Sequence, residues 1–301
     1  MLSDNIYEST FMDLLSDFGF KRAFGMPDHS EEFLIDFLNE LLSDDPGFDR
    51  IVSVSYRNVE KSPNFKDDKM VRYDLFCETS TGHRFIVEMQ KRNKPNFRDR
   101  AAYYVSRETY DQGIRSEMGE WDFNLLPVVG VFITNFFVPG VDRDLVVRGK
   151  IINPRTGNVV IDKIQYNFVQ LPAFDKTEEE CVTGFDKWIY ILKNMETLKE
   201  IPFKEYRDRL FDRLGELSRV ANLNMKEREQ YEDYLKWARD YNAEMRYERE
   251  EGIAQGRAEG RAEGRAEVLR HTVLKMRAAG LDEKTISEFT DLSIDEIHKI
   301  K

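Results

Sequence analysis

Two acidic side chains and one amide stand at spacings that would let them act together in the segment 72–91. The residues 85–90 follow the period of two that indicates a β-strand, so Glu88 and Gln90 share one face of it, roughly 6.5–7 Å apart. Asp74 lies fourteen residues before Glu88, in the preceding strand. Carboxylate and amide oxygens on one sheet face suit a divalent cation, and such a cation supports phosphodiester hydrolysis.

The turn at 80–82 decides whether Asp74 joins this group. A three-residue loop, with Gly82 at positive φ, places Asp74 directly across from Glu88. A two-residue loop would place Asp74 opposite Met89, because a slip of one residue moves a side chain to the other face. For the three-residue loop, we expect the two carboxylates within roughly 4–6 Å of each other, where one ion bridges them.

This motif and its flanks resemble a known nuclease superfamily. Asp74 followed by Glu88-Met89-Gln90 resembles the Asp…Glu-X-Lys core of the PD-(D/E)XK nucleases, in a Glu-X-Gln form. The segments 17–25 (Asp-Phe-Gly-Phe-Lys-Arg-Ala-Phe-Gly) and 97–104 (Phe-Arg-Asp-Arg-Ala-Ala-Tyr-Tyr) resemble the Rpn-type recombination-promoting nucleases, a transposase-like family. So do the Gly-Arg-Ala-Glu repeats near the end, and the resemblance covers essentially the whole chain.

The resemblance implies an α/β fold with a restriction-endonuclease-like core, in which helices flank a mixed central sheet, and an all-helical C-terminal extension. It implies a metal-dependent DNA endonuclease associated with recombination or mobile elements, with Asp74, Glu88 and Gln90 as its catalytic residues. Mg²⁺ or Mn²⁺ would bind Asp74 and Glu88, with the Met89 carbonyl and water completing the octahedron.

Gln90 stands where the superfamily usually has a lysine. An amide can orient a water molecule, but it adds no positive charge. The alternative hypothesis is therefore a catalytically weak or inactive nuclease-fold protein that binds DNA or another partner.

Further polar residues are accessory candidates. Asp17 and Lys21 are spaced to reach the site from an N-terminal helix, or equally to form an ion pair on a solvated helix face. Gln112 follows Arg98 by nearly four helical turns, on a similar face, and is expected to line the site. The DNA-contact candidates are Lys91, Arg98 and Arg100, although Lys91 points away from Gln90 as the next strand residue.

Composition narrows the class of protein. The 301 residues, 41% hydrophobic, can form one sizeable core with an appended segment. No run of eighteen apolar residues and no charged-then-apolar leader is present, so neither a membrane span nor a secretory signal is expected. Two cysteines, expected to be buried, suit a reducing cytoplasm. The four histidines have no ligand spacing, which disfavours zinc.

Charge is distributed unevenly. A net charge of −11 argues against an open basic surface that coats nucleic acid. Residues 84–100 nevertheless hold six basic and two acidic side chains, a local balance of +4 beside the carboxylates. Such a cluster would attract a polyanion.

Periodicity places the elements that must position these residues. Helices are predicted at 10–24, 31–42 and 96–117. Strands are predicted at 51–59, 127–138 and 159–171, and the hairpin described above has its strands at 72–79 and 84–91. A charged loop is predicted at 63–69. The run at 127–138 is almost wholly apolar, which indicates a strand covered on both faces. This order predicts an α/β sandwich around a mixed sheet, spanning 1–175.

The remainder is predicted to be helical. An extension at 176–251 includes helices near 204–221 and 226–251. A separate module at 268–301 is predicted to contain three short helices and to contact another protein. Between them, glycines recur every fourth residue in the Gly-Arg-Ala-Glu repeat at 252–267, and like charges stack four residues apart. A lone helix there is marginal. A linker and a partner-binding helix both fit, and an antiparallel second copy would place arginines against glutamates, giving a homodimer or oligomer.

Overall fold

The computed structural model describes residues 9–27, 29–45, 48–61, 71–114 and 124–300. The chain divides into two compact units, Met1–Tyr234 and Leu235–Lys301. The predicted boundary near residue 175 does not separate them, because helices beyond it pack on the N-terminal helices. No helix in the described ranges is long and apolar enough to cross a membrane.

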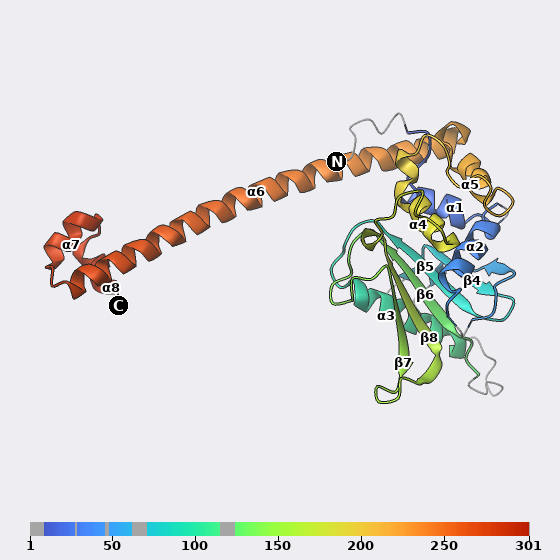
Figure 1. Ribbon diagram of the computed structural model, residues 1–301, viewed down its shortest axis with the longest axis horizontal. Helices are drawn as coiled ribbons and strands as arrows, with labels where there is room; N and C mark the ends of the chain where they lie inside the picture. The colour runs from blue at the N-terminus through green and yellow to red at the C-terminus, as the bar shows by residue number, and fades with distance from the viewer. Residues whose placement is uncertain (1–8, 28, 46–47, 62–70, 115–123, 301) are drawn as a thin grey trace. The chain divides into compact units, whose positions relative to one another are not determined.

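A mixed sheet forms the centre of the first unit (Figure 1). In the described part of the chain its order is β1-β4-β5-β6-β8-β7, with β5, β6 and β8 parallel and the other neighbours antiparallel. The fold class expected from the sequence is thus confirmed. The strands are β1 (Val54–Tyr56), β4 (Leu75–Thr79), β5 (Arg84–Gln90), β6 (Val128–Thr134), β7 (Val146–Ile152) and β8 (Val159–Gln170), with a separate small pair β2 (Glu60–Lys61) and β3 (Val71–Arg72).

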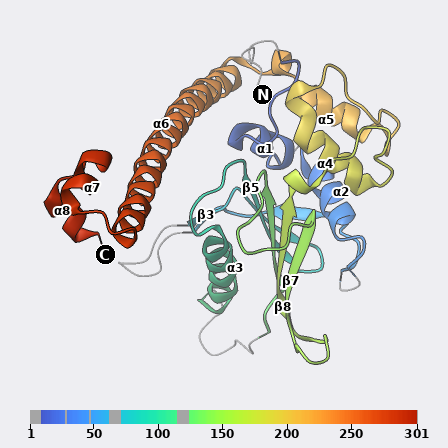
Figure 2. The ribbon, with the colours of Figure 1, turned by 60° about the vertical axis from the view of Figure 1, so that its left-hand side comes forward.

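Helices cover both faces of this sheet (Figure 2). On one face, α3 (Phe97–Ile114) packs Phe97, Ala101 and Val105 against Ile86 and Phe132. On the other face, α1 (Asp17–Phe24) ends at Gly25, next to Leu75 of β4. Every residue of β6 is buried, as the apolar run predicted. Because parallel strands β5 and β6 are joined through α3, the carboxyl end of β5 lies close to the start of that helix.

Some elements before residue 175 differ from the prediction. α1 begins at Asp17 and not at residue 10, because the Ser16 side chain caps the Gly19 N–H and fixes the start. β1 is shorter than the strand predicted at 51–59, and β7 was not predicted at all. The predicted loop at 63–69 and the predicted end of α3 at 115–117 lie outside the described residues.

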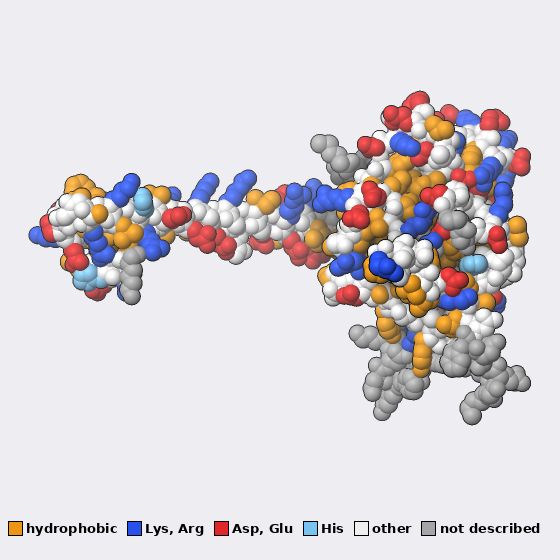
Figure 3. Space-filling view, turned by 60° about the horizontal axis from the view of Figure 1, so that its bottom comes forward, with side chains coloured by type: hydrophobic (Ala, Val, Ile, Leu, Met, Phe, Trp, Pro, Cys, Tyr) orange, Lys and Arg blue, Asp and Glu red, His pale blue; other side chains and the backbone are white. Residues whose placement is uncertain are grey.

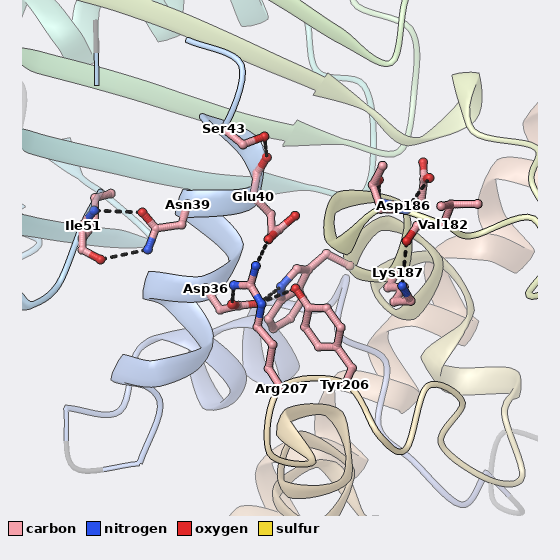
Figure 4. Close-up of polar contacts among 12 residues, drawn as sticks. Asp36, Asn39, Glu40, Ser43, Ile51, Val182, Asp186, Lys187, Tyr206 and Arg207 are labelled. Carbon is pink, nitrogen blue, oxygen red and sulfur yellow. Dashed lines mark hydrogen bonds and ion pairs between the residues drawn. The ribbon is translucent and has the colours of Figure 1, made fainter. Parts of the chain in front are cut away.

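A polar network ties α2 (Glu31–Leu41) to the helices that follow the sheet (Figure 4). The buried Asp36 carboxylate accepts the Trp188 Nε1–H at 2.8 Å, from α4 (Gly184–Asn194), and the Tyr206 hydroxyl at 3.2 Å. Arg207 forms ion pairs with both Asp36 and Glu40. The rings of Trp188, Phe24 and Phe37 also meet, so α1, α2 and α4 share one core.

The helix predicted at 204–221 is shorter in the structure than expected. Arg207, Asp208 and Arg209 have positive φ values of 40°, 51° and 61°, so α5 begins only at Leu210. Left-handed backbone at residues with a Cβ costs roughly 1–2 kcal/mol each. The Arg207 ion pairs hold the strained segment in place. Between β8 and residue 222 the remaining elements are α5 (Leu210–Ser218) and three short 3-10 helices, η2 (Leu171–Ala173), η3 (Met195–Thr197) and η4 (Val220–Asn222).

The second unit is helical. The Gly-Arg-Ala-Glu repeat lies within one continuous helix, α6 (Met225–Ala278), which also contributes residues 225–234 to the first unit. α7 (Glu283–Thr290) and α8 (Ile294–Lys299) follow, packed around Val273, Ile286 and Ile297. These helices are capped: Gly280 has a φ of 81° after α6, and the Asp282 and Ser293 side chains accept backbone N–H groups at the starts of α7 and α8.

Candidate active site

The hairpin formed by β4 and β5 has the predicted register. The Thr79 N–H donates to the His83 carbonyl at 2.9 Å, and Gly82 has a φ of 84°, so the loop contains the three residues 80–82. Leu75 pairs with Val87. One residue further, Asp74 therefore stands across from Glu88, on the sheet face that Phe76 and Ile86 present to α3.

Backbone hydrogen bonds lock the two carboxylates together. The Asp74 N–H donates to Glu88 Oε1 at 3.0 Å, and the Met89 N–H donates to Asp74 Oδ2 at 2.8 Å. Each carboxylate thereby accepts one backbone N–H, and within the described residues the structure gives no hydrogen bond to Asp74 Oδ1 or Glu88 Oε2. Both acidic residues keep an oxygen for a further ligand.

The end of strand pairing creates this arrangement. β4 begins at Leu75, so Met89 lies beyond the last β4–β5 pair. The Met89 N–H donates to the Asp74 carboxylate instead of to a backbone carbonyl of β4. The Met89 carbonyl accepts a hydrogen bond from Gln90 Nε2 at 2.9 Å. The Met89 carbonyl is therefore close to the carboxylates, where the sequence predicted it as a metal ligand.

Burial shapes the charge of the pair. Glu88 is only 3% exposed, and burial, followed by the negative charge of Asp74, raises the pKa of Glu88 to about 8. Burial also raises the pKa of Asp74, against the Met89 N–H, which lowers it. Without a cation, the protein thus favours one shared proton over two adjacent negative charges.

The donor set fits a hard divalent cation. No group of three His, Cys, Asp or Glu side chains that could hold a metal occurs among the described residues. Mg²⁺ nevertheless is commonly bound by one or two carboxylates, with water and substrate phosphate oxygens as the other ligands. Asp74 and Glu88, with their unbonded oxygens, can supply the carboxylates.

Arg100 and Tyr104 of α3 lie beside the carboxylates. The Arg100 guanidinium stands 5.2 Å from the Phe97 ring centroid and 5.9 Å from that of Tyr104. Its positive charge lowers the pKa of Asp74 and of Glu88, after the burial that raises both. Sequence reasoning did not place Tyr104 here, although its spacing of four residues from Arg100 on a helix was a signal.

Asp17 and Lys21 form the ion pair on a solvated helix face that was one of their two alternatives. They form an i,i+4 ion pair at 2.7 Å, with side chains 67% and 41% exposed. After burial and the Met89 hydrogen bond, the negative charge of Asp17 raises the pKa of Asp74 and the positive charge of Lys21 lowers it. Both line an open cavity of about 520 Å³ together with Arg22 and Tyr234.

Other candidates are placed elsewhere. Gln112 is a correction: its side chain binds both the N–H and the carbonyl of Leu126, at 2.8 and 3.0 Å, and does not join the carboxylates. Twelve residues of helix separate it from Arg100, about 18 Å. Lys91 forms an ion pair with the buried Asp13, and Arg84 pairs with Glu108. Two of the six basic side chains in the segment 84–100 are thus neutralised by acidic partners, which reduces the positive charge available on the surface.

Arg98 remains exposed at the start of α3. Its Nη1 donates to the Gly140 carbonyl at 3.1 Å, which connects α3 to the loop after β6. Asp74, Glu88 and Gln90 thus share one sheet face, and Arg100 belongs to the helix that packs on that face.

A mixed sheet between helices, with paired carboxylates where β4 and β5 separate, defines a restriction-endonuclease-like α/β protein. A sequence model of the PD-(D/E)XK nuclease family transposase matches residues 14–248, and the chain belongs to that family. No curated protein and no solved structure gave a match.

Proposed function

We propose that this protein is a metal-dependent DNA endonuclease that hydrolyses phosphodiester bonds and takes part in recombination or in the movement of mobile elements. The observation that carries the proposal is the Asp74–Glu88 pair on one sheet face, where each carboxylate keeps one oxygen to which no described residue donates a hydrogen bond. Membership of a nuclease family supports it.

The chain's own residues have separate roles. Asp74 and Glu88 would hold Mg²⁺ or Mn²⁺, which when bound polarises the phosphate and lowers the pKa of an attacking water. The hydrogen bonds from the Asp74 and Met89 N–H groups fix how the carboxylates point. Gln90 orients water through its amide, whose Nε2 is held by the Met89 carbonyl.

DNA is the proposed substrate, and the cytoplasm the proposed location. Arg98 and Arg100 stand on the first turn of α3, where phosphates of a bound duplex would pass the carboxylates. Lys91 is left out of this set because Asp13 holds its ammonium. Lys21 lines the open cavity beside α1 together with Asp17, whose carboxylate pairs with its ammonium.

The test is cleavage of supercoiled plasmid by the purified chain. Nicked or linear product should accumulate with Mg²⁺ or Mn²⁺ and not with EDTA, because two carboxylates alone activate no water. Single-stranded DNA and RNA in parallel reactions report the substrate preference. Failure to cleave any of these nucleic acids under any metal condition would remove the endonuclease proposal.

A second candidate function is DNA or partner binding by a nuclease fold that has lost most of its activity. The observation that favours it is Gln90, which places a neutral amide where the family pattern has a lysine. In that case Mn²⁺ and DNA would still bind, and no product would form.

We also propose that two copies associate through the exposed repeat in α6. Figure 3 shows basic and acidic side chains gathered along different sides of this helix. A Cβ built at Gly252, Gly256, Gly260 or Gly264 would meet no atom within 4 Å, so that side is open. An antiparallel copy would bring arginines of one helix opposite glutamates of the other and let the backbones approach closely.

Charge reversal in the full chain tests this association. Replacing Arg257, Arg261 and Arg265 by glutamate should shift the mass measured by light scattering from dimer towards monomer, because like charges would then face each other. A swapped control, with those arginines changed to glutamate and Glu259, Glu263 and Glu267 changed to arginine, should recover the dimer. Equal masses for wild type and the reversed variant would contradict the proposal.

A further inference from the structure

The proposed site is short of one positive charge. Two ionised carboxylates and one divalent cation cancel, while a phosphodiester carries one negative charge and gains a second as a nucleophile attacks. Preorganised positive groups aimed at such developing charge are usually a large part of catalysis. Gln90 cannot supply one, because its amide is neutral.

Two nearby lysines are already paired. Lys21 is bound by Asp17 at 2.7 Å, on an exposed helix face. Lys91 points to the opposite side of the sheet, where the buried Asp13 holds it. Neither offers an uncompensated charge to a phosphate.

Arg100 is different. Its Nη2 is buried and makes no hydrogen bond within the described residues. The rings of Phe97 and Tyr104 hold the guanidinium plane in place at 5.2 and 5.9 Å. α3 packs on the sheet face that carries Asp74 and Glu88, and the positive charge of Arg100 acts on both carboxylates. A buried N–H donor without a partner is unfavourable, and an arriving phosphate oxygen would satisfy it.

We propose that Arg100 is a catalytic residue that binds the scissile phosphate and supplies the positive charge that Gln90 lacks. This inference rests on the proposed endonuclease function. In the reaction, a water oxygen bonds to phosphorus and the bond from phosphorus to the leaving oxygen breaks. One water proton passes to solvent, the leaving oxygen is protonated, and no electron is exchanged. Arg100 donates to a non-bridging oxygen throughout and transfers nothing.

Separate measurements of rate and binding test the assignment in the full chain. Arg100→Gln should lower the single-turnover cleavage rate at saturating protein by about a hundredfold, a typical loss for one charge-stabilising donor. DNA affinity, measured with Ca²⁺ in place of Mg²⁺, should fall less than about threefold, because one phosphate contact among many is lost. Mn²⁺ affinity without DNA should rise, because a positive charge near both carboxylates is gone.

Two further variants sharpen the result. Gln90→Lys combined with Arg100→Gln should regain at least about tenfold of the lost rate, since the charge returns from the strand instead of the helix. Arg143→Gln removes another arginine that stacks on a phenylalanine, 5.0 Å from the Phe137 ring, and should change neither rate nor affinity.

The outcomes are distinct. Cleavage at the wild-type rate by Arg100→Gln, or a double variant no faster than the single one, overturns the role of Arg100 alone. A lower rate accompanied by weaker Mn²⁺ binding and a lower melting temperature assigns Arg100 to structure and also overturns it. Absence of cleavage by the wild type removes the proposed function, and this inference with it.

Discussion

Glu88→Gln is expected to abolish DNA cleavage and, at the same time, to stabilise the metal-free protein. The glutamine keeps an acceptor for the Asp74 N–H, so the local structure should persist. It removes a ligand charge, which should lower the cleavage rate by at least about a thousandfold. It also removes a buried negative charge that stands beside Asp74, which is a destabilising arrangement.

The stabilisation should depend on pH in a defined window. Burial raises the folded-state pKa of Glu88 to about 8, from an ordinary value near 4.5. Below pH 4.5 the side chain is protonated in both folded and unfolded states, so wild type and variant should be equal. Between pH 4.5 and 8 only the unfolded state releases the proton, and wild-type stability falls as the pH rises. Above pH 8 the difference should level off, on the order of a few kcal/mol.

Urea unfolding in EDTA across pH 4–9 measures this difference. Adding Mg²⁺ at pH 8 should raise the stability of wild type and not of Glu88→Gln, because the ion binds the ionised pair. Glu229→Gln, at an exposed position of α6, removes the same charge and should leave stability and cleavage unchanged. A Glu88→Gln variant less stable than wild type at every pH would contradict the charge argument.

Asp36→Ala is expected to destabilise the first unit by about 3 kcal/mol or more. Trp188 is fully buried, and its N–H would lose its acceptor. Arg207 would lose one of its two carboxylate partners and, with it, a restraint on the left-handed residues 207–209 (Figure 4). Urea midpoints followed by tryptophan fluorescence and circular dichroism give the change in the free energy of unfolding.

Two variants define the source of that loss. Asp36→Asn keeps an oxygen acceptor for Trp188 and loses the charge, so its destabilisation should lie between wild type and Asp36→Ala. Glu200→Ala breaks the exposed ion pair with Lys204 and should cost less than about 0.5 kcal/mol. If Asp36→Ala matched Glu200→Ala, the network would be shown to contribute nothing beyond a surface pair.

The core of the candidate site was predictable because strand parity and turn geometry are local. The period of two put Glu88 and Gln90 on one face, and Gly82 specified the loop that brings Asp74 across. The position of Gln112 was not predictable in the same way. Helical periodicity gives a residue's face and says nothing of which loop competes for its amide, and Leu126 takes both of its hydrogen bonds.

The missed parts of the fold depend on contacts distant in sequence. β7 carries charges and Gly149 within a short apolar pattern, and it forms a strand by pairing antiparallel with β8, while Arg148 and Lys150 pair with Asp44 and Asp45. The segment 207–209 has helix-forming residues, yet its backbone is set by ion pairs to α2. Neither partner is visible from local periodicity.

The loop at 80–82 gives the exposed tip of the hairpin an unusual kind of constraint. Surface turns ordinarily tolerate changes of length better than changes in the core. Here one residue more or fewer would shift the pairing of Asp74 and turn its carboxylate away from Glu88, five positions along the strand from the pair that closes the loop. Natural variation at this turn should therefore be free in side-chain identity at the first position and fixed in length, because the length of the loop sets which residue faces Glu88 at the opposite end of the hairpin.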